Sequence, residues 1–98
     1  MTYSFDGRAT LPTDVMHRTV GDQSVILDLK TERYLGLDPI GTHMWSTILE
    51  APSLESAYQK LLSEYDIEPS RLREELQTFL GKLVSNGLIH ISDLSGRN

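Results

Sequence analysis

The 98-residue chain contains no cysteine. It therefore has no disulfide framework, no thiolate nucleophile and no cysteine-based metal site. Its apolar runs are much shorter than the roughly 20 residues that a helix needs to cross a bilayer. The first ten residues carry Asp6 and Arg8 and no apolar stretch, so we do not expect a signal peptide. These absences predict a cytoplasmic protein that does not bind membranes.

Basic residues are also scarce. Nine lysines and arginines face fourteen aspartates and glutamates, which gives a formal net charge of −5. A field of this sign repels the phosphates of nucleic acids. Hydrophobic residues make up 39% of the chain and charged residues 23%, which is the composition of a folded globular protein. The length fits one domain.

The residue patterns of catalytic sites are missing. The three histidines, His17, His43 and His90, lie on different predicted elements and lack the spacing of a zinc site. No serine sits in a Gly-x-Ser-x-Gly turn, and the glycines are too scattered for a phosphate-binding loop. Glu74 and Glu75 are adjacent in a predicted helix, so their carboxylates diverge by about 100°. We therefore expect no enzyme activity, no metal and no cofactor.

Three strands are predicted in the first part of the chain. Residues 1–14 mix small, polar and turn-forming residues and are expected to be a flexible lead-in. Val15–Val20 alternates in polarity as a strand does, and Gly21-Asp22 marks a turn. The second strand begins at Gln23 or Ser24 and ends near Leu29, and the third covers Arg33–Leu37.

The leucines of the second and third strands suggest how these strands pair. A three-residue loop over residues 30–32 places the leucines of both strands on one face, which we expect to be the buried one. Such a loop usually ends with a glycine at positive φ, and Glu32 at that place costs about 1 kcal/mol. The predicted pairs are Leu29 with Arg33, Leu27 with Leu35, and Val25 with Leu37.

Three helices follow. Asp38-Pro39 is a strong helix start, because the carboxylate can cap the helix and proline suits the first position. This helix is expected to reach Glu50. Ser53 caps the second helix. The apolar stripe of the first helix is predicted to contain Ile40, Met44, Trp45, Ile48 and Leu49, and that of the second Leu54, Ala57, Tyr58, Leu61, Leu62 and Tyr65.

The third helix is predicted to cover residues 69–86, and Asn86-Gly87 ends it. Residues 88–92 form a short final strand or an extended tail, and residues 93–98 are expected to fray. The chain is therefore expected to be an α+β protein in which a three-stranded antiparallel sheet precedes three helices, as in a winged helix-turn-helix. The predicted domain spans residues 15–92.

The third strand has no later strand to cover its second edge. Unpaired backbone groups at a sheet edge are a template for another strand. Gly36 has no side chain that would block an incoming backbone. The third helix has more apolar residues than one buried stripe needs, so part of it can line a groove beside the strand. We predict that a peptide pairs with the backbone of Arg33, Tyr34, Leu35, Gly36 and Leu37. The side chains of the peptide are expected to contact Tyr34, Leu72, Leu76 and Phe79. Charged residues of the peptide are expected to contact Arg73 or Glu75.

A DNA-binding regulator is a second hypothesis. In a winged helix-turn-helix the third helix would read the bases, and it carries Arg71, Arg73 and Lys82. Glu74 and Glu75 on the same helix would repel the phosphates of DNA. We therefore expect that the protein binds no nucleic acid.

The ordered pieces of the sequence resemble the PqqD-like family of peptide chaperones. The resemblance extends from about Val15 to Ile91, and it depends on the combination of short patterns rather than on a single motif. The residues that carry it are Leu27-Asp28-Leu29, Tyr34 to Asp38, Gly41, Met44-Trp45, Tyr65 to Pro69, and Gly87-Leu88.

With Trp45, the chain looks like the free-standing leader-recognition proteins of lasso peptide biosynthesis. The resemblance implies a non-catalytic recognition element that binds the leader of a ribosomally made precursor peptide as an extra strand. It also implies presentation of that precursor to a separate cysteine leader peptidase. A partner of a radical SAM enzyme in another peptide pathway is a third hypothesis. Family members commonly have glycine where this chain has Glu32.

Overall fold

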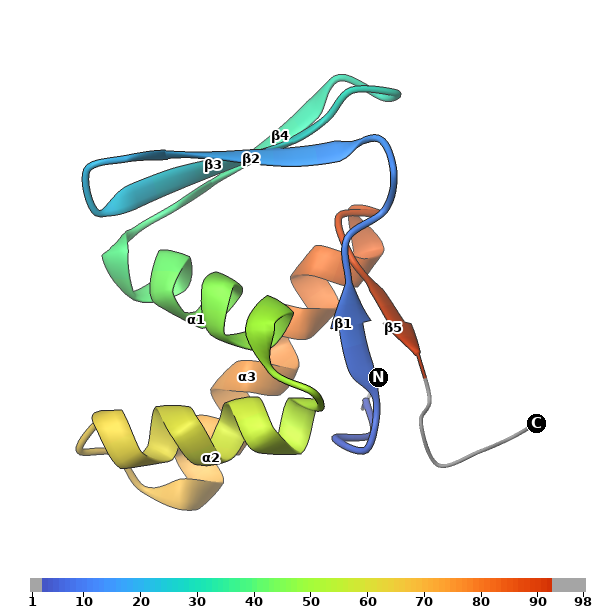
Figure 1. Cartoon of the computed structure of the whole chain (residues 1–98). Helices are drawn as coiled ribbons and strands as arrows, with labels where there is room; N and C mark the ends of the chain where they lie inside the picture. The colour runs from blue at the N-terminus through green and yellow to red at the C-terminus, as the bar shows by residue number, and fades with distance from the viewer. Residues whose placement is uncertain (1–2, 93–98) are drawn as a thin grey trace.

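The computed structural model describes residues 3–92, which form two small sheets and three helices (Figure 1). The predicted α+β class, with a three-stranded antiparallel sheet followed by three helices, is confirmed. β2, β3 and β4 form this sheet in that order, and β1 pairs with β5 in a separate antiparallel ribbon. The elements are β1 (Arg8–Thr10), β2 (Val15–Val20), β3 (Gln23–Asp28), β4 (Arg33–Leu37), α1 (Pro39–Glu50), α2 (Leu54–Glu64), α3 (Pro69–Ser85) and β5 (His90–Ser92).

The helices begin and end at the residues that the sequence indicated. Asp38 Oδ1 accepts a hydrogen bond from the Gly41 N–H at 2.7 Å, and Pro39 occupies the first position of α1. Ser53 caps α2 in the same way, through the N–H of Ser56 at 3.1 Å. Gly87 has a φ of +71° just after α3, where a left-handed residue ends a helix. Local capping chemistry therefore sets these boundaries.

The N-terminal segment differs from the expected flexible lead-in, because residues 3–10 pack onto the helices. Phe5 is buried, and its carbonyl accepts the Glu55 N–H at 2.8 Å. The Gly7 carbonyl accepts the Leu54 N–H at 2.8 Å. These bonds satisfy first-turn N–H groups of α2 that have no partner within the helix. Together with β1, this segment stands beside α1 and α2 (Figure 1). The predicted frayed tail at 93–98 lies outside the described residues.

The predicted pairing of β3 with β4 is wrong by one residue. Ile26 lies opposite Leu35, and Asp28 lies opposite Arg33 across a four-residue loop. The buried face of β3 therefore carries Ser24, Ile26 and Asp28 rather than the predicted Val25, Leu27 and Leu29. Leu35 and Leu37 do face the core, as predicted.

Hydrogen bonds explain how two polar residues occupy that inner face. Ser24 Oγ and Thr42 Oγ1 lie 2.8 Å apart, so the two hydroxyls satisfy each other. The Asp28 carboxylate accepts the Lys30 N–H at 2.9 Å, which closes the loop to β4. Ile26 is then fully buried between them. Glu32 takes the predicted positive φ, at 62°.

The outer face of the sheet is apolar and exposed. Met16, Leu27 and Tyr34 lie side by side across β2, β3 and β4. Tyr34 is 75% exposed and Met16 47% exposed, and Val25 in the next row is also exposed. Exposed apolar side chains gathered in one row can form a contact surface for a partner, although Arg18 and Gln23 lie on the same face.

The core lies below the sheet, between the three helices. Most of the predicted stripe residues are buried, but Ile40 is 58% exposed because it lies in the first turn of α1, next to the open end of the sheet. The fully buried large side chains are Ile26, Trp45, Ile48, Leu54, Leu61, Leu76, Leu80, Leu83, Leu88 and Ile89. None of the helices within residues 3–92 has the length and apolar character needed to cross a bilayer.

Replacing Glu32 with glycine should stabilise the protein by about 0.5–1 kcal/mol, because glycine adopts positive φ without a steric cost. Chemical denaturation of the wild type and the variant measures this. Glu32→Ala is the matched control, since alanine keeps the Cβ atom and should give no gain. Equal stabilisation by both variants would contradict a conformational origin.

Candidate functional site

The second edge of β4 is open. Within residues 3–92, no strand pairs with it, because β4 ends the order β2-β3-β4. A Cβ atom built on Gly36 would have no atom within 4 Å, so the backbone there can be approached freely. β2 forms the other edge of the sheet, but the two larger hollows described next have no residue of β2 in their lining.

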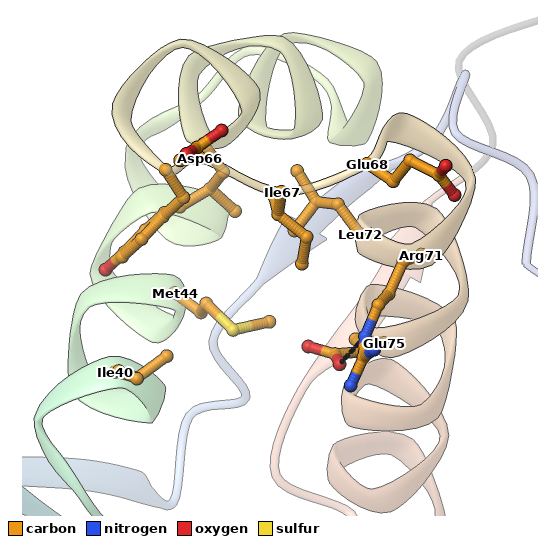
Figure 2. A pocket seen from close by; sticks show the side chains of 10 residues that line it. Ile40, Met44, Asp66, Ile67, Glu68, Arg71, Leu72 and Glu75 are labelled. Atoms are coloured by element: carbon orange, nitrogen blue, oxygen red, sulfur yellow. Dashed lines mark hydrogen bonds and ion pairs between the residues drawn. The ribbon is translucent and has the colours of Figure 1, made fainter.

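Two hollows lie between α1 and α3. The first has a volume of about 630 Å³. Figure 2 shows Ile40 and Met44 on α1 facing Arg71 and Glu75 on α3, with Ile67 and Leu72 between them. The second, of about 540 Å³, is lined by Asp38, Ile40, Gly41, Met44, Glu74, Glu75, Thr78, Phe79 and Lys82.

The two hollows form one depression, since Ile40, Met44 and Glu75 line both. We call it the α1–α3 groove. It reaches the sheet at Asp38, the residue after β4. A third hollow, of about 350 Å³, also touches Asp38. It spans the sheet from Val20 at the end of β2, across the start of β3, to Gly36 and Leu37 of β4. Each volume is in the range of natural ligand pockets. An extended segment could thus lie along β4 and place side chains in the groove.

Several predicted site residues meet in this groove. Phe79 contributes apolar surface, and Glu75 contributes a carboxylate at the junction of the two hollows. Leu72 lines the first hollow but is only 4% exposed and belongs mainly to the core. The backbone from Arg33 to Leu37 forms the open edge as predicted.

Other predicted site residues lie elsewhere. Leu76 is 0% exposed and belongs to the core. Tyr34 projects from the outer face of the sheet, in the row of Met16 and Leu27. The Arg73 guanidinium lies 4.6 Å from the centroid of the Phe5 ring and 4.3 Å from that of Tyr58. It is therefore held between the N-terminal segment and α2 by cation–π contacts.

Ion pairs on the helices reduce the free positive charge. Arg71 Nε lies 3.1 Å from Glu75 Oε2, and Arg73 Nη2 lies 3.5 Å from Glu55 Oε1. Two of the three cations considered for a DNA-reading face are thus paired. Elsewhere, the 2.7 Å contact from His43 Nε2 lowers the pKa of the Glu64 carboxyl below its ordinary value of 4.5. No group of three metal-ligating side chains occurs in the part of the chain that the structure describes.

The sequence matches a known family over most of its length. The family model for coenzyme PQQ synthesis protein D (PqqD) covers residues 23–89. The chain belongs to the PqqD family. The predicted resemblance is therefore confirmed. A comparison with curated proteins finds no significant match.

Two solved structures resemble this PqqD-family chain. One is TbiB1 in complex with the TbiA(beta) leader peptide, with a TM-score of 0.77 and 27% sequence identity over 83% of this chain and 94% of that chain. The other is lasso peptide synthetase B1 complexed with the leader peptide, with a TM-score of 0.76 and 20% identity over 85% of this chain and 98% of that chain. At 20% identity the second likeness shows the fold alone.

Ile40 and Met44 are among the groove residues that sequence reasoning missed. Both lie in the apolar stripe of α1, and such a stripe usually marks the side of a helix that is buried in the core. The position of Ile40 in the sequence could have indicated its place in the groove, since it lies in the first turn of the helix that begins just after β4. Residues at the junction of an open edge and a helix are well placed to contact a peptide on that edge.

The charge of Asp28 should make stability depend on pH. The Lys30 N–H that donates to the Asp28 carboxylate holds its pKa below the ordinary value of 3.8. A carboxyl whose pKa is lower in the folded state stabilises fully above its unfolded pKa and loses this contribution as pH falls through the folded value.

Asp28→Asn should therefore destabilise the protein near pH 7. The difference in the free energy of unfolding between variant and wild type should shrink as pH falls below about 3.8. Chemical unfolding of both proteins across this range measures it. A difference that stays constant with pH would show that the charge of Asp28 is unimportant.

Proposed function

We propose that this chain binds the leader segment of a ribosomally synthesised precursor peptide, specifically a lasso peptide precursor. The leader adds to β4 as an extra antiparallel or parallel strand, and its side chains enter the α1–α3 groove. The observation that carries this proposal is the meeting, at Asp38, of the unpaired β4 edge and the groove. Strand addition gives affinity through backbone hydrogen bonds, and a neighbouring groove gives specificity.

The comparisons support this function. TbiB1, which shares 27% of its residues with this chain, is complexed with a leader peptide. The match covers 94% of the TbiB1 chain in that complex, so the likeness extends over nearly the whole leader-bound chain.

The energetics require apolar anchors. A disordered leader loses a few kcal/mol of conformational freedom when it binds. Each fully buried aliphatic or aromatic anchor contributes about 1.5–3 kcal/mol. Two or three anchors therefore offset the ordering cost, and Ile40 and the partly exposed Phe79 supply surface against which they can pack. Leu76 acts by holding α3 in place, and Arg73 by fixing α3 to the N-terminal segment.

The chain has no catalytic role in this proposal and presents the bound precursor to a separate cysteine leader peptidase. The apolar outer face of the sheet supports a docking role, since Met16, Leu27 and Tyr34 lead across the sheet to the edge on which the leader adds. A peptidase seated there would be next to the bound leader.

Peptide binding should be visible in the backbone amides of β4. In an antiparallel sheet, alternate N–H groups of an edge strand point away from its partner. Every second amide from Arg33 to Leu37 should thus exchange quickly in the free protein and become protected in the complex. Hydrogen exchange measured by NMR tests this with a peptide selected from a displayed random library. Protection of β2 amides instead, or no peptide binding, would overturn the proposed function.

The same titration also tests whether the side chain of Ile40 contributes to peptide binding. Ile40→Ala removes exposed surface, so the fold should persist while peptide affinity falls about tenfold. Leu11→Ala removes another exposed aliphatic side chain, one that lines none of the three hollows, and is the matched control. Equal effects of the two substitutions would remove α1 from the site.

Met16→Asp tests the presentation step. The aspartate introduces a charge into the apolar outer face, so leader removal by the partner peptidase should slow at least about tenfold. Affinity for the isolated peptide should not change, because Met16 is two strands away from the β4 edge. Thr13→Asp, in an exposed loop, carries the same charge change as a control. An unchanged cleavage rate would show that the peptidase docks elsewhere.

A further inference from the structure

The rim of the α1–α3 groove is strongly acidic. Its charged lining residues are the carboxylates Asp38, Asp66, Glu68, Glu74 and Glu75 and the cations Arg71 and Lys82. The apolar surface of Ile40 and Phe79 lies among these charges. An occupant that fits must therefore bring apolar side chains together with positive charge.

The cations of the protein do little to neutralise this rim. Arg71 is paired with Glu75 across one helical turn (Figure 2). Arg73 is the next cation on α3, but it stacks on Phe5 and Tyr58 and pairs with Glu55 outside the groove. Lys82 makes none of the ion pairs found within residues 3–92 and stands alone at the far end of the groove from Glu68. Negative charge therefore remains in excess.

The carboxylates fall into two sets along α3. Asp66 and Glu68 precede the helix, and Glu74 and Glu75 lie about two turns further on. At 1.5 Å per residue, Glu68 and Glu75 are roughly 10 Å apart along the helix axis. An extended peptide rises about 3.3 Å per residue and points alternate side chains the same way. Peptide residues two positions apart are thus about 7 Å apart on the same side of the strand, and residues four positions apart are about 13 Å apart. The distance between the two carboxylate sets lies between these values.

We propose that the leader recognised by this chain is cationic where it crosses the groove. It carries lysine or arginine residues two or four positions apart that flank an apolar anchor. The apolar anchor packs on Ile40 and Phe79, and the cations face the two carboxylate sets. This inference rests on the proposed leader-binding function and specifies the class of peptide that the same site selects. Leaders with acidic residues at these places are rejected by like-charge repulsion.

Selection from a phage-displayed library of random peptides tests the charge preference, with binding to the whole chain as the criterion. Peptides that protect the β4 amides should be enriched in lysine and arginine around an apolar residue. Their affinity should fall with added sodium chloride, because exposed ion pairs are screened.

Charge reversal provides the matched comparison. Glu68→Lys with Glu74→Lys changes both carboxylate sets at exposed positions, and Asp22→Lys with Glu50→Lys makes the same change in net charge at exposed positions outside the groove lining. Exposed ion pairs contribute about twofold to fivefold each, so the groove variant should lose roughly 4- to 25-fold in affinity for a selected lysine peptide. The same peptide with glutamate in place of lysine should prefer the groove variant. Circular dichroism confirms that both variants remain folded.

The outcomes separate the two proposals. Peptides that protect β4 without enrichment in cations, or that respond equally to both double variants, would overturn the cationic preference and leave the leader-binding function intact. Failure to select any peptide that protects β4 would overturn both.

Discussion

The cap that Asp38 forms on α1 is the interaction on which the site depends. Its carboxylate accepts the Gly41 N–H at 2.7 Å, and Pro39 starts the helix directly after β4. No loop separates the strand from the helix, so the open edge of β4 continues into the first turn of α1. Ile40 is therefore placed beside the edge rather than in the core. A longer connection would separate the two halves of the proposed site.

The N-terminal segment gives α2 and α3 a second support. Backbone carbonyls of Phe5 and Gly7 accept N–H groups from the first turn of α2, and Gln77 on α3 exchanges two hydrogen bonds of 2.7 Å with the backbone of Tyr3. Arg73 adds its cation–π contacts to Phe5 and Tyr58. One side of α3 thus contacts the N-terminal segment, and another side lines the groove.

In the proposed site, backbone groups provide affinity and side chains provide selectivity. Unpaired groups on β4 can bond any extended peptide, since backbone hydrogen bonds do not depend on sequence. Selectivity must then come from the apolar surface of the groove and from its acidic rim. This division suits the proposed function, in which a disordered leader is held firmly enough to be presented and loosely enough to be released. The outer face of the sheet remains available for another protein while the edge is occupied.

The sequence by itself determined the helix boundaries, the fold class and the family, but it did not indicate β1 (Arg8–Thr10). Capping residues such as Asp38 and Ser53 act on their own helices, so these features can be read locally. Only the tertiary structure decided which face of β3 is buried, because β3 has apolar residues on both faces and periodicity cannot choose between them. The same limit hid the groove role of Ile40 and the stacking of Arg73 on Phe5. Each depends on contacts between segments distant in the chain, which no local pattern records.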